Sequence, residues 1–246
     1  MPPEIRELDA GFKVLVESEM EKYRADTFWT KEPETVEWIR SFKNGDIFWD
    51  IGANIGIYSL FAAKMLPASV IWSFEPQFIN FIRLVQNVGL NSIPNIVPLN
   101  IAFGRVSRIT QFYAKENEPG KSGGQIDAPV DEHGNNYKPQ EVLPMISMSG
   151  DDFLKYFDAP PPNHIKIDVD GREEGIIFGL QYVLGIPLLK SILVELNPES
   201  SNSNMVESLI KSCGFSVDNE FNKMQNHSRV RREQEGIKAR NVVFTR

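Results

Sequence analysis

The hydrophobic and polar positions of this chain change their period repeatedly from residue 46 onward. Short runs of β-branched and aromatic residues, the first at residues 47–51, alternate with longer segments in which apolar residues recur every three or four positions. The short runs predict strands and the longer segments predict helices. This alternation is typical of an α/β fold with a mostly parallel sheet and helices on both faces.

The predicted elements follow one another in a regular order. Strands are expected at residues 47–51, 70–74, 95–102, 165–169, 191–196, 215–218 and 241–245. Helices are expected at residues 55–66, 78–90, 173–184 and 204–213. Pro98 lies within the third strand, so we expect that strand to be short or irregular.

Two parts of the chain depart from this alternation. Residues 1–44 are expected to form a helical cap, either over the sheet or at a dimer contact, and residues 45–246 the main domain. We expect an insertion at about residues 105–150, with an extra strand at 109–113. Residues 115–140 have no period and are rich in Gly, Asn, Pro and charge. A loop of this length inside a domain is usually functional or disordered.

Composition narrows the classes of function. The 246 residues suffice for one α/β domain, and 41% hydrophobic with 24% charged residues is ordinary for a globular protein. A net charge of -7 disfavours nucleic acid and anionic membranes as general partners. The single cysteine, Cys213, excludes an intramolecular disulfide. No secretory signal or membrane span is evident, so we expect a cytoplasmic protein, whose oligomeric state the sequence leaves open.

The first predicted strand ends in a glycine-rich turn that leads into a helix. Such a turn brings a nucleotide against a helix N-terminus. The turn contains Gly52, Asn54 and Gly56, but Ile57 stands where a dinucleotide fingerprint has its third glycine. Asparagine tolerates a left-handed backbone, so Asn54 can replace a glycine here.

Acidic residues around this turn indicate the charge of the cofactor. Asp50 at the strand end would repel a pyrophosphate, whereas it favours the sulfonium and ammonium groups of S-adenosylmethionine. Glu75 ends the second strand, where an acid can accept both ribose hydroxyls. Asn100 and Ala102 follow the third strand, where the adenine edge is expected, although a strand leaving the core also explains them. An NAD-dependent oxidoreductase is the disfavoured alternative.

Polar residues also follow the next two strands. Asp168, Asp170, Glu195 and Asn197 lie at strand exits, where ligands bind in open α/β sheets. We expect them to converge on the site of chemistry. Our hypothesis is that Asp168 faces the methionine end of the cofactor, and that either Asp170 or Glu195 accepts a proton from the substrate. A purely structural carboxylate network around Lys166 is the alternative.

Three further expectations concern basic residues and metals. Lys166 is expected to be an ion-pair partner of these acids, and His164, at the opposite end of its strand, to be structural or solvated. Asp168, Asp170 and Asn197 also form a set of Mg²⁺ ligands, which we do not favour, so no metal site is assigned. The basic run at residues 229–232 is either a solvated loop or a rim that attracts an anionic substrate, with His227 beside it as an alternative base.

Several of these segments together resemble one family. They are residues 50–59 (DIGANIGIYS), 74–76 (FEP), 166–171 (KIDVDG), 194–198 (VELNP) and 241–244 (NVVF), and together they are similar to FkbM-family methyltransferases. The similarity runs from about Glu34 to the C-terminus.

The resemblance implies a Rossmann-like, seven-stranded class I methyltransferase sheet whose last strand is antiparallel. It also implies S-adenosylmethionine as cofactor and O-methylation of a hydroxyl on a sugar, polyketide or related metabolite. The acceptor is therefore expected to be a small molecule or a glycan. Asp170 departs from the glutamate more often found in the family, and Arg172 from an apolar or aromatic residue. A methyltransferase-like binding protein without turnover is the alternative.

Overall fold

The centre of the fold is a seven-stranded sheet with the strand order β12-β13-β11-β10-β3-β4-β5. The computed structural model describes residues 3–131, 134–197, 201–224 and 239–246. The strands of this sheet are β3 (Ile47–Ile51), β4 (Val70–Phe74), β5 (Ile96–Leu99), β10 (His164–Ile167), β11 (Ser191–Leu196), β12 (Ser216–Val217) and β13 (Arg240–Thr245). Neighbours from β5 to β11 are parallel, and β13 runs antiparallel to β11 and β12. The predicted fold class is confirmed.

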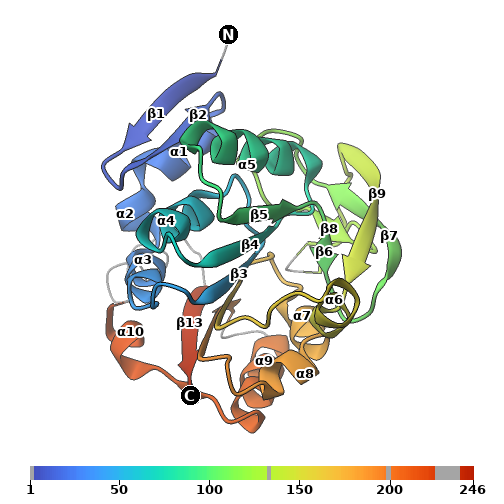
Figure 1. Cartoon of the computed structure of the whole chain (residues 1–246). Helices are drawn as coiled ribbons and strands as arrows, with labels where there is room; N and C mark the ends of the chain where they lie inside the picture. The colour runs from blue at the N-terminus through green and yellow to red at the C-terminus, as the bar shows by residue number, and fades with distance from the viewer. Residues whose placement is uncertain (1–2, 132–133, 198–200, 225–238) are drawn as a thin grey trace.

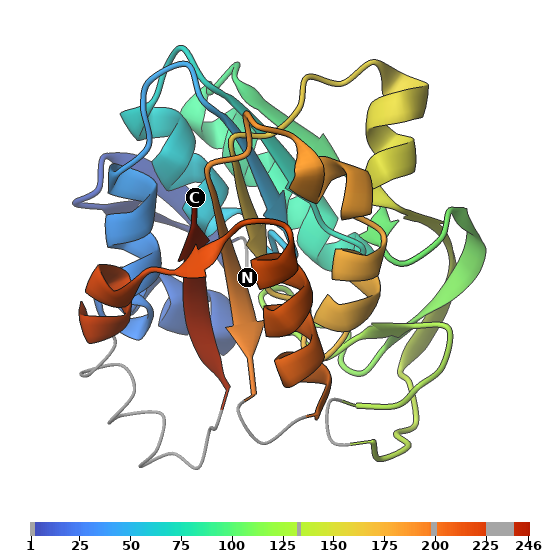
Figure 2. The ribbon, with the colours of Figure 1, turned by 90° about the horizontal axis from the view of Figure 1, so that it is seen from below.

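Helices cover both faces of the sheet, as Figures 1 and 2 show. One face carries α3 (Pro33–Arg40), α4 (Ile57–Met65), α5 (Phe78–Asn91) and α10 (Asn219–Met224), and the other α6 (Gly150–Phe157), α7 (Glu173–Phe178), α8 (Gln181–Gly185) and α9 (Ser201–Ser212). Because side chains alternate along a strand, Phe48 packs in the first core and Trp49 in the second. None of the described helices is long and apolar enough to cross a membrane.

The helix predicted at residues 173–184 is divided in two. The division falls at Gly179, whose backbone lies so close to the insertion that an added Cβ would stand 2.2 Å from the carbonyl oxygen of Gly104. This close approach lies between the end of α7 and the start of α8, and the apolar period alone does not reveal it.

The N-terminal cap is not purely helical. Its first elements, β1 (Glu4–Leu8) and β2 (Phe12–Val16), pair as an antiparallel hairpin, and α1 (Glu19–Asp26) and α2 (Phe28–Lys31) follow. The helical prediction is therefore wrong for residues 4–16. Phe12, Val14 and Val16 alternate with more exposed residues, which is the period of a strand, and Gly11 turns the hairpin at φ +82°.

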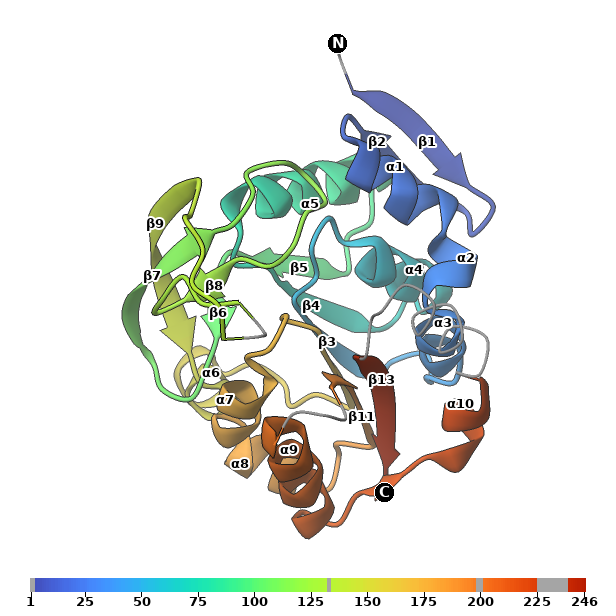
Figure 3. The same cartoon turned by 180° about the vertical axis from the view of Figure 1, so that it is seen from behind.

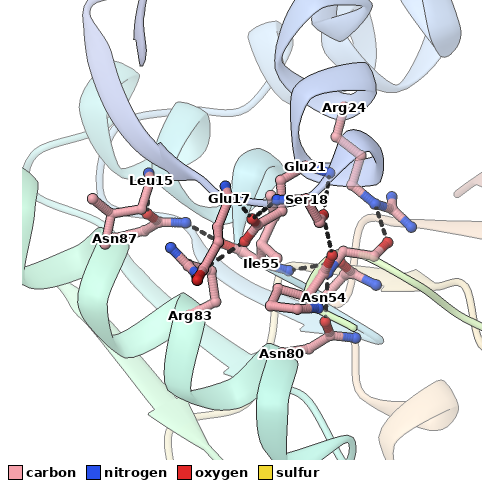
Figure 4. Close-up of polar contacts among 12 residues, drawn as sticks. Leu15, Glu17, Ser18, Glu21, Arg24, Asn54, Ile55, Asn80, Arg83 and Asn87 are labelled. Atoms are coloured by element: carbon pink, nitrogen blue, oxygen red, sulfur yellow. Dashed lines mark hydrogen bonds and ion pairs between the residues drawn. The ribbon is translucent and has the colours of Figure 1, made fainter. Parts of the chain in front are cut away.

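The cap packs on helices of its own chain. The carboxylate of Glu21 is fully buried and pairs with Arg83 of α5 at 2.9 Å. The backbone N–H of Leu15 donates to Asn87 Oδ1 over 2.8 Å, so the hairpin is also attached to α5 (Figure 4). Apolar residues of the cap and of α4 share one hydrophobic core.

The insertion forms a second, four-stranded sheet. Its order is β6-β9-β7-β8, from β6 (Ala102–Phe103), β7 (Arg108–Ala114), β8 (Gln125–Ile126) and β9 (Glu141–Met148). The extra strand predicted at residues 109–113 is confirmed as β7, whereas β9 was not predicted. Figure 3 shows this sheet on the side of the molecule away from the N-terminal hairpin.

Candidate cofactor and active site

The glycine turn joins β3 to α4 and holds three residues in the left-handed conformation. They are Gly52 (φ +84°), Asn54 (φ +52°) and Gly56 (φ +84°), so the conformation expected for Asn54 is confirmed. A Cβ at Gly52 would stand 2.0 Å from the backbone oxygen of Asp168, and one at Gly56 2.2 Å from Leu84 Cδ1. The two glycines are thus required by the backbone and by the space around it.

Asp50 lies at the base of the turn and is buried. Its Oδ2 accepts a 2.5 Å hydrogen bond from the Ser59 hydroxyl, whose oxygen in turn accepts one from Ser73 at 2.7 Å. Its Oδ1 has no hydrogen-bond partner among the described residues. Burial raises the pKa of Asp50 above its usual value, while the positive charge of Lys166 opposes that rise. An unsatisfied buried acceptor is costly and is frequently found where a ligand binds.

Glu75 extends from the end of β4 to the glycine turn. Its two carboxylate oxygens accept hydrogen bonds from the backbone N–H groups of Asn54 at 2.7 Å and Gln77 at 2.8 Å. Burial raises the pKa of Glu75 to about 7 despite these two donors. The side chain of Asn100 donates to the carbonyl oxygen of Glu75 at 2.8 Å, and Ala102 is buried at the start of the second sheet.

Lys166 and Asp168 form an ion pair beside the turn. Lys166 is only 1% exposed and its Nζ donates to Asp168 Oδ2 over 2.8 Å, which confirms the predicted ion pair. Burial opposes the charge on Lys166, but Asp168 and Asp50 outweigh it and raise the pKa of the ammonium group. Burial likewise opposes the charge on Asp168, yet Lys166 holds the pKa of that carboxyl below its usual value.

Sheet register brings Glu195 to the same face of the sheet. Lys166 lies opposite Asp50 on β3 and opposite Leu193 on β11. Asp168 and Glu195 come two residues later along their strands. Because side chains alternate between the two faces of a strand, both lie on the same face as Lys166. Glu195 lies opposite Asn241 on that face. A shared face is compatible with the expected convergence of the strand-exit residues, which stays a prediction.

Asp170 is held differently. It has a left-handed backbone (φ +55°), and its carboxylate accepts a 2.9 Å hydrogen bond from the backbone N–H of Gly123. Its carbonyl oxygen accepts from the Gln125 side chain at 2.7 Å. Asp170 thus contacts the insertion, and its expected role as a base stays a prediction. Asn197, at the exit of the next strand, donates its backbone N–H to the Ser203 hydroxyl.

Residues 116–126, here called the strap, run over the glycine turn. The side chains of Asn54 and Asn80 both donate to the carbonyl oxygen of Lys121, at 3.0 and 2.9 Å. From the cap, the Ser18 hydroxyl donates to the carbonyl oxygen of Pro119 at 2.6 Å (Figure 4). The strap belongs to the segment that sequence analysis could only describe as aperiodic, and it is tied to the cap, to α5, to the turn and to Asp170.

Two site residues were not predicted from the sequence. Glu32, between α2 and α3, is 1% exposed, and the hydroxyl of Tyr58 on α4 donates a hydrogen bond to its carboxylate. The Lys166 ammonium group stands 5.3 Å from the centre of the Tyr58 ring. Proline directly after Glu32 signalled a helix start, but nothing in the sequence signalled that this acid is buried.

A second polar network lies at the opposite, amino end of the strands. His164 Nδ1 is 2.7 Å from the Ser191 hydroxyl and its Nε2 is 3.0 Å from Asp46 Oδ2. The imidazole stacks on Phe42 with 3.7 Å between ring centres, and the Trp38 indole donates to Ser191. Burial lowers the pKa of His164 to about 4. Of the two alternatives expected for His164, structural or solvated, the solvated one is wrong, because the side chain is buried.

The magnesium alternative gains no support from the part of the chain that the structure describes. No group of three His, Cys, Asp or Glu side chains there is arranged to hold a metal ion. The basic run at residues 229–232 and His227 lie outside the described residues.

Comparison with protein families gives one match over most of the chain. Residues 50–217 match the model of the methyltransferase FkbM domain. A hexuronic acid methyltransferase, AglP of Haloferax volcanii, is 26% identical over 140 residues, which are 56% of this chain and 52% of the relative. The chain thus spans about half the length of that relative. Methyltransferase 1 of Beauveria bassiana is 23% identical over 191 residues, covering 73% of this chain and 76% of the relative.

Comparison with solved structures concerns the fold. A methyltransferase FkbM from Methylobacillus flagellatus aligns with a TM-score of 0.54 and 14% identity, over 93% of this chain and 50% of that one. At this identity the similarity extends to the Rossmann-like architecture and not to individual side chains.

Proposed function

Because the chain belongs to the FkbM family of methyltransferases, we propose that it transfers the methyl group of S-adenosylmethionine to a hydroxyl oxygen of a sugar, polyketide or related metabolite. When bound, this cofactor supplies a methyl group already activated by its positively charged sulfur. The protein then has to hold donor and acceptor in line, at roughly 3–3.5 Å between the reacting atoms, and to accept the proton of the hydroxyl.

The observation that carries this proposal is the excess of buried negative charge beside the glycine turn. Asp50 and Glu32 are buried, the side chain of Asp168 beside them is 25% exposed, and Lys166 is the deeply buried cation among them. Such a site favours a cationic ligand, because uncompensated charge interacts strongly where water is excluded. A sulfonium cofactor fits this charge, and a pyrophosphate-bearing dinucleotide does not. Oδ1 of Asp50, which no described residue satisfies, is a further acceptor for a ligand.

The same residues give each part of the cofactor a plausible partner. Gly52 and Gly56 allow the tight turn that packs against Asp168 and Leu84, and Glu75 beside the turn can accept the ribose hydroxyls. Asn100 and the backbone near Ala102 are assigned to the adenine edge.

For the chemistry, we assign Asp168 to the methionine end of the cofactor, and Glu195 or Asp170 to the proton of the acceptor. Asp168 is fixed by Lys166, which suits a binding role. Glu195 shares the face of the sheet with Asp168, whereas Asp170 is tied to the strap beside the site. Both therefore remain candidates for the base, and their amide variants, Glu195→Gln and Asp170→Asn, distinguish them through turnover at unchanged cofactor affinity.

For the acceptor, a sugar acid is the most specific proposal. Its support is the similarity to a hexuronic acid methyltransferase, together with the basic run at residues 229–232. The net charge of -7 supports a small-molecule or glycan acceptor over a nucleic acid. A cytoplasmic location, and a division into a cap at residues 1–44 and a methyltransferase domain at 45–246, belong to the same proposal.

Calorimetric titration and a turnover assay test the proposal together. We expect binding of S-adenosylmethionine and not of NAD⁺, and release of S-adenosylhomocysteine when a panel of hexuronic acids and neutral sugars is offered. Binding of NAD⁺ alone would overturn the proposal. Binding of S-adenosylmethionine without turnover on any acceptor would instead support the silent binding protein.

A further inference from the structure

A buried acid from the cap reaches the proposed cofactor site. Glu32 connects α2 to α3 and is 1% exposed, although it lies outside the residues 50–217 that match the family model. A carboxylate is rarely buried so fully unless it is paired, because removal from water costs several kcal/mol. Lys31 supplies part of that pairing, with its Nζ 2.5 Å from Glu32 Oε1, but Lys31 itself is partly exposed.

A short path of contacts runs from Glu32 into the centre of the site. The Tyr58 hydroxyl donates to the Glu32 carboxylate, and the ring of Tyr58 faces the Lys166 ammonium group at 5.3 Å. Lys166 in turn donates to Asp168 at 2.8 Å. Tyr58 and Lys166 are both buried, so water cannot replace the hydrogen bond or screen the charge that is lost when Glu32 is changed.

The charge of Glu32 acts on the same groups. Its carboxylate interacts electrostatically with Asp50, Lys166 and Asp168, the groups that surround the glycine turn. In this environment, Oδ1 of Asp50 has no hydrogen-bond partner within the part of the chain that the structure describes. The cap thus adds negative charge to a place that already contains more buried carboxylates than cations, which weakens the fold unless a cationic ligand binds there.

We propose that Glu32 is a positioning residue of the cofactor site, which acts through Tyr58 and Lys166 on Asp168 and makes the site prefer a positively charged cofactor over its neutral product. This inference rests on the proposed function. S-adenosylmethionine and S-adenosylhomocysteine share their nucleoside and amino-acid groups and differ in one methyl group and the positive charge on sulfur. Loss of the charge of Glu32 should therefore weaken binding of S-adenosylmethionine more than binding of S-adenosylhomocysteine. Damage to the shape of the site should weaken the binding of both ligands.

The test is the ratio of the two dissociation constants, measured by calorimetry on the full chain. In Glu32→Gln we expect the affinity for S-adenosylmethionine to fall about fivefold more than that for S-adenosylhomocysteine, because a unit charge is lost from a partly screened site. Glu32→Asp keeps the charge and should keep the parent ratio. Equal losses for both ligands in Glu32→Gln, or an unchanged ratio, would overturn the proposal.

Glu34→Gln is the matched control. Glu34 is equally buried and lies two residues away, but its carboxylate accepts from Asn241 at 3.2 Å instead of from Tyr58. We expect a clearly smaller change in the ratio, and an equal change would contradict the assignment to Glu32. If Glu32→Gln does not fold, Glu32→Met fills the same volume without charge and gives the same measurement. If neither neutral variant folds while Glu32→Asp does, Glu32 serves the fold alone and the proposal is wrong.

The parent protein separates this inference from the function on which it rests. A parent that binds neither ligand refutes the proposed function. A parent that binds both, with Glu32→Gln at the parent ratio, refutes only the role of Glu32.

Discussion

Both ends of the central sheet contain buried polar side chains, but the hydrogen bonding of these side chains differs between the two ends. At the amino end, His164 uses both ring nitrogens, on Ser191 and Asp46, and its face stacks on Phe42. At the carboxyl end, Asp50 has an oxygen without a partner among the described residues, and burial raises the pKa of Glu75 to about 7. The first network is complete within the protein, whereas the second is not.

This difference indicates that a ligand binds at the carboxyl end of the strands and not at the amino end. A complete network of buried hydrogen bonds stabilises one arrangement of the chain. Unpartnered acceptors and acids of raised pKa cost stability, and they persist where a ligand satisfies them. The Ser191–His164–Asp46 arrangement resembles a catalytic triad in residue type alone, since all three side chains are buried at the end of the strands opposite the ligand-binding edge.

The largest effect is expected from an alanine at the carboxyl end of β3. Gly52→Ala forces a Cβ to within 2.0 Å of the Asp168 backbone oxygen and adds strain at φ +84°. We expect turnover to fall more than about 100-fold, because a displacement of about 1 Å in a site has that effect. Gly45→Ala at the amino end is the control, since Gly45 also has a positive φ but nothing within 4 Å of its added Cβ. Equal losses in both variants would show that backbone strain, and not the contact with Asp168, is responsible.

Removal of a side chain from the hydrogen-bond network at the amino end should lower stability without changing turnover. His164→Ala removes one hydrogen-bond partner from Ser191 and one from Asp46, and it removes the ring that stacks on Phe42. We expect the free energy of unfolding in urea to fall by about 2–4 kcal/mol, with kcat unchanged at a temperature where the variant is folded. A large fall in kcat of the folded variant would contradict the division between the two ends.

For Asp50 we expect a loss of cofactor affinity without a loss of stability. Asp50→Asn keeps an acceptor for Ser59 but removes a buried charge, so the affinity for S-adenosylmethionine should fall about tenfold. The free energy of unfolding should stay within about 1 kcal/mol of the parent or rise, because the cost of burying the charge is removed. Calorimetry and urea titration measure the two quantities on one sample. A large loss of stability with full cofactor affinity would show that Asp50, like His164, serves the stability of the fold and not ligand binding.

The pH dependence of stability should have opposite signs at the two ends. Glu75 has its pKa raised from 4.5 to about 7 on folding, so its contribution is complete below pH 4.5 and is lost as the pH rises through 7. His164 has its pKa lowered from 6.5 to about 4, so its contribution is complete above pH 6.5 and is lost as the pH falls through 4.

Single variants isolate these two contributions in urea titrations between pH 4.5 and 6.5. Removing the ionisable group by Glu75→Gln should make the slope of unfolding free energy against pH more positive, and His164→Gln should make it more negative. Each change is at most about 1.4 kcal/mol per pH unit, the value for one proton. Slopes that change in the same direction would show that one of the two pKa shifts has the wrong sign.

Some elements could be predicted in detail because a local pattern determines them. The bounds of β3, β4 and β11 agree with the prediction to the residue, since each is a β-branched or aromatic run between turn signals. Pro98 shortens β5, which is an edge strand where a missing N–H does little harm. The ion pair of Lys166 with Asp168 followed from the two-residue period of a strand.

Other features depend on contacts between distant parts of the chain. Glu32 is an acid at a helix start, and its burial arises only when α4 and β10 pack beside it. The hairpin at residues 4–16 was missed because two short strands carry little periodicity. Strand β9 is defined by its pairing with β7, across 26 intervening residues that show no period.

The strap also bears on the order in which the molecule is assembled. Its contacts with Ser18, Arg24, Asn54 and Asp170 join residues 101, 96, 67 and 47 positions apart. Closing loops of this length costs entropy that must be recovered by contacts formed elsewhere first. The strap can therefore make its full set of contacts only when the cap, the first half of the sheet and the exit of β10 are in place. A chain emerging from the ribosome can complete the contacts of the strap only after Asp170 has been made, so the proposed cofactor site is expected to close late in folding.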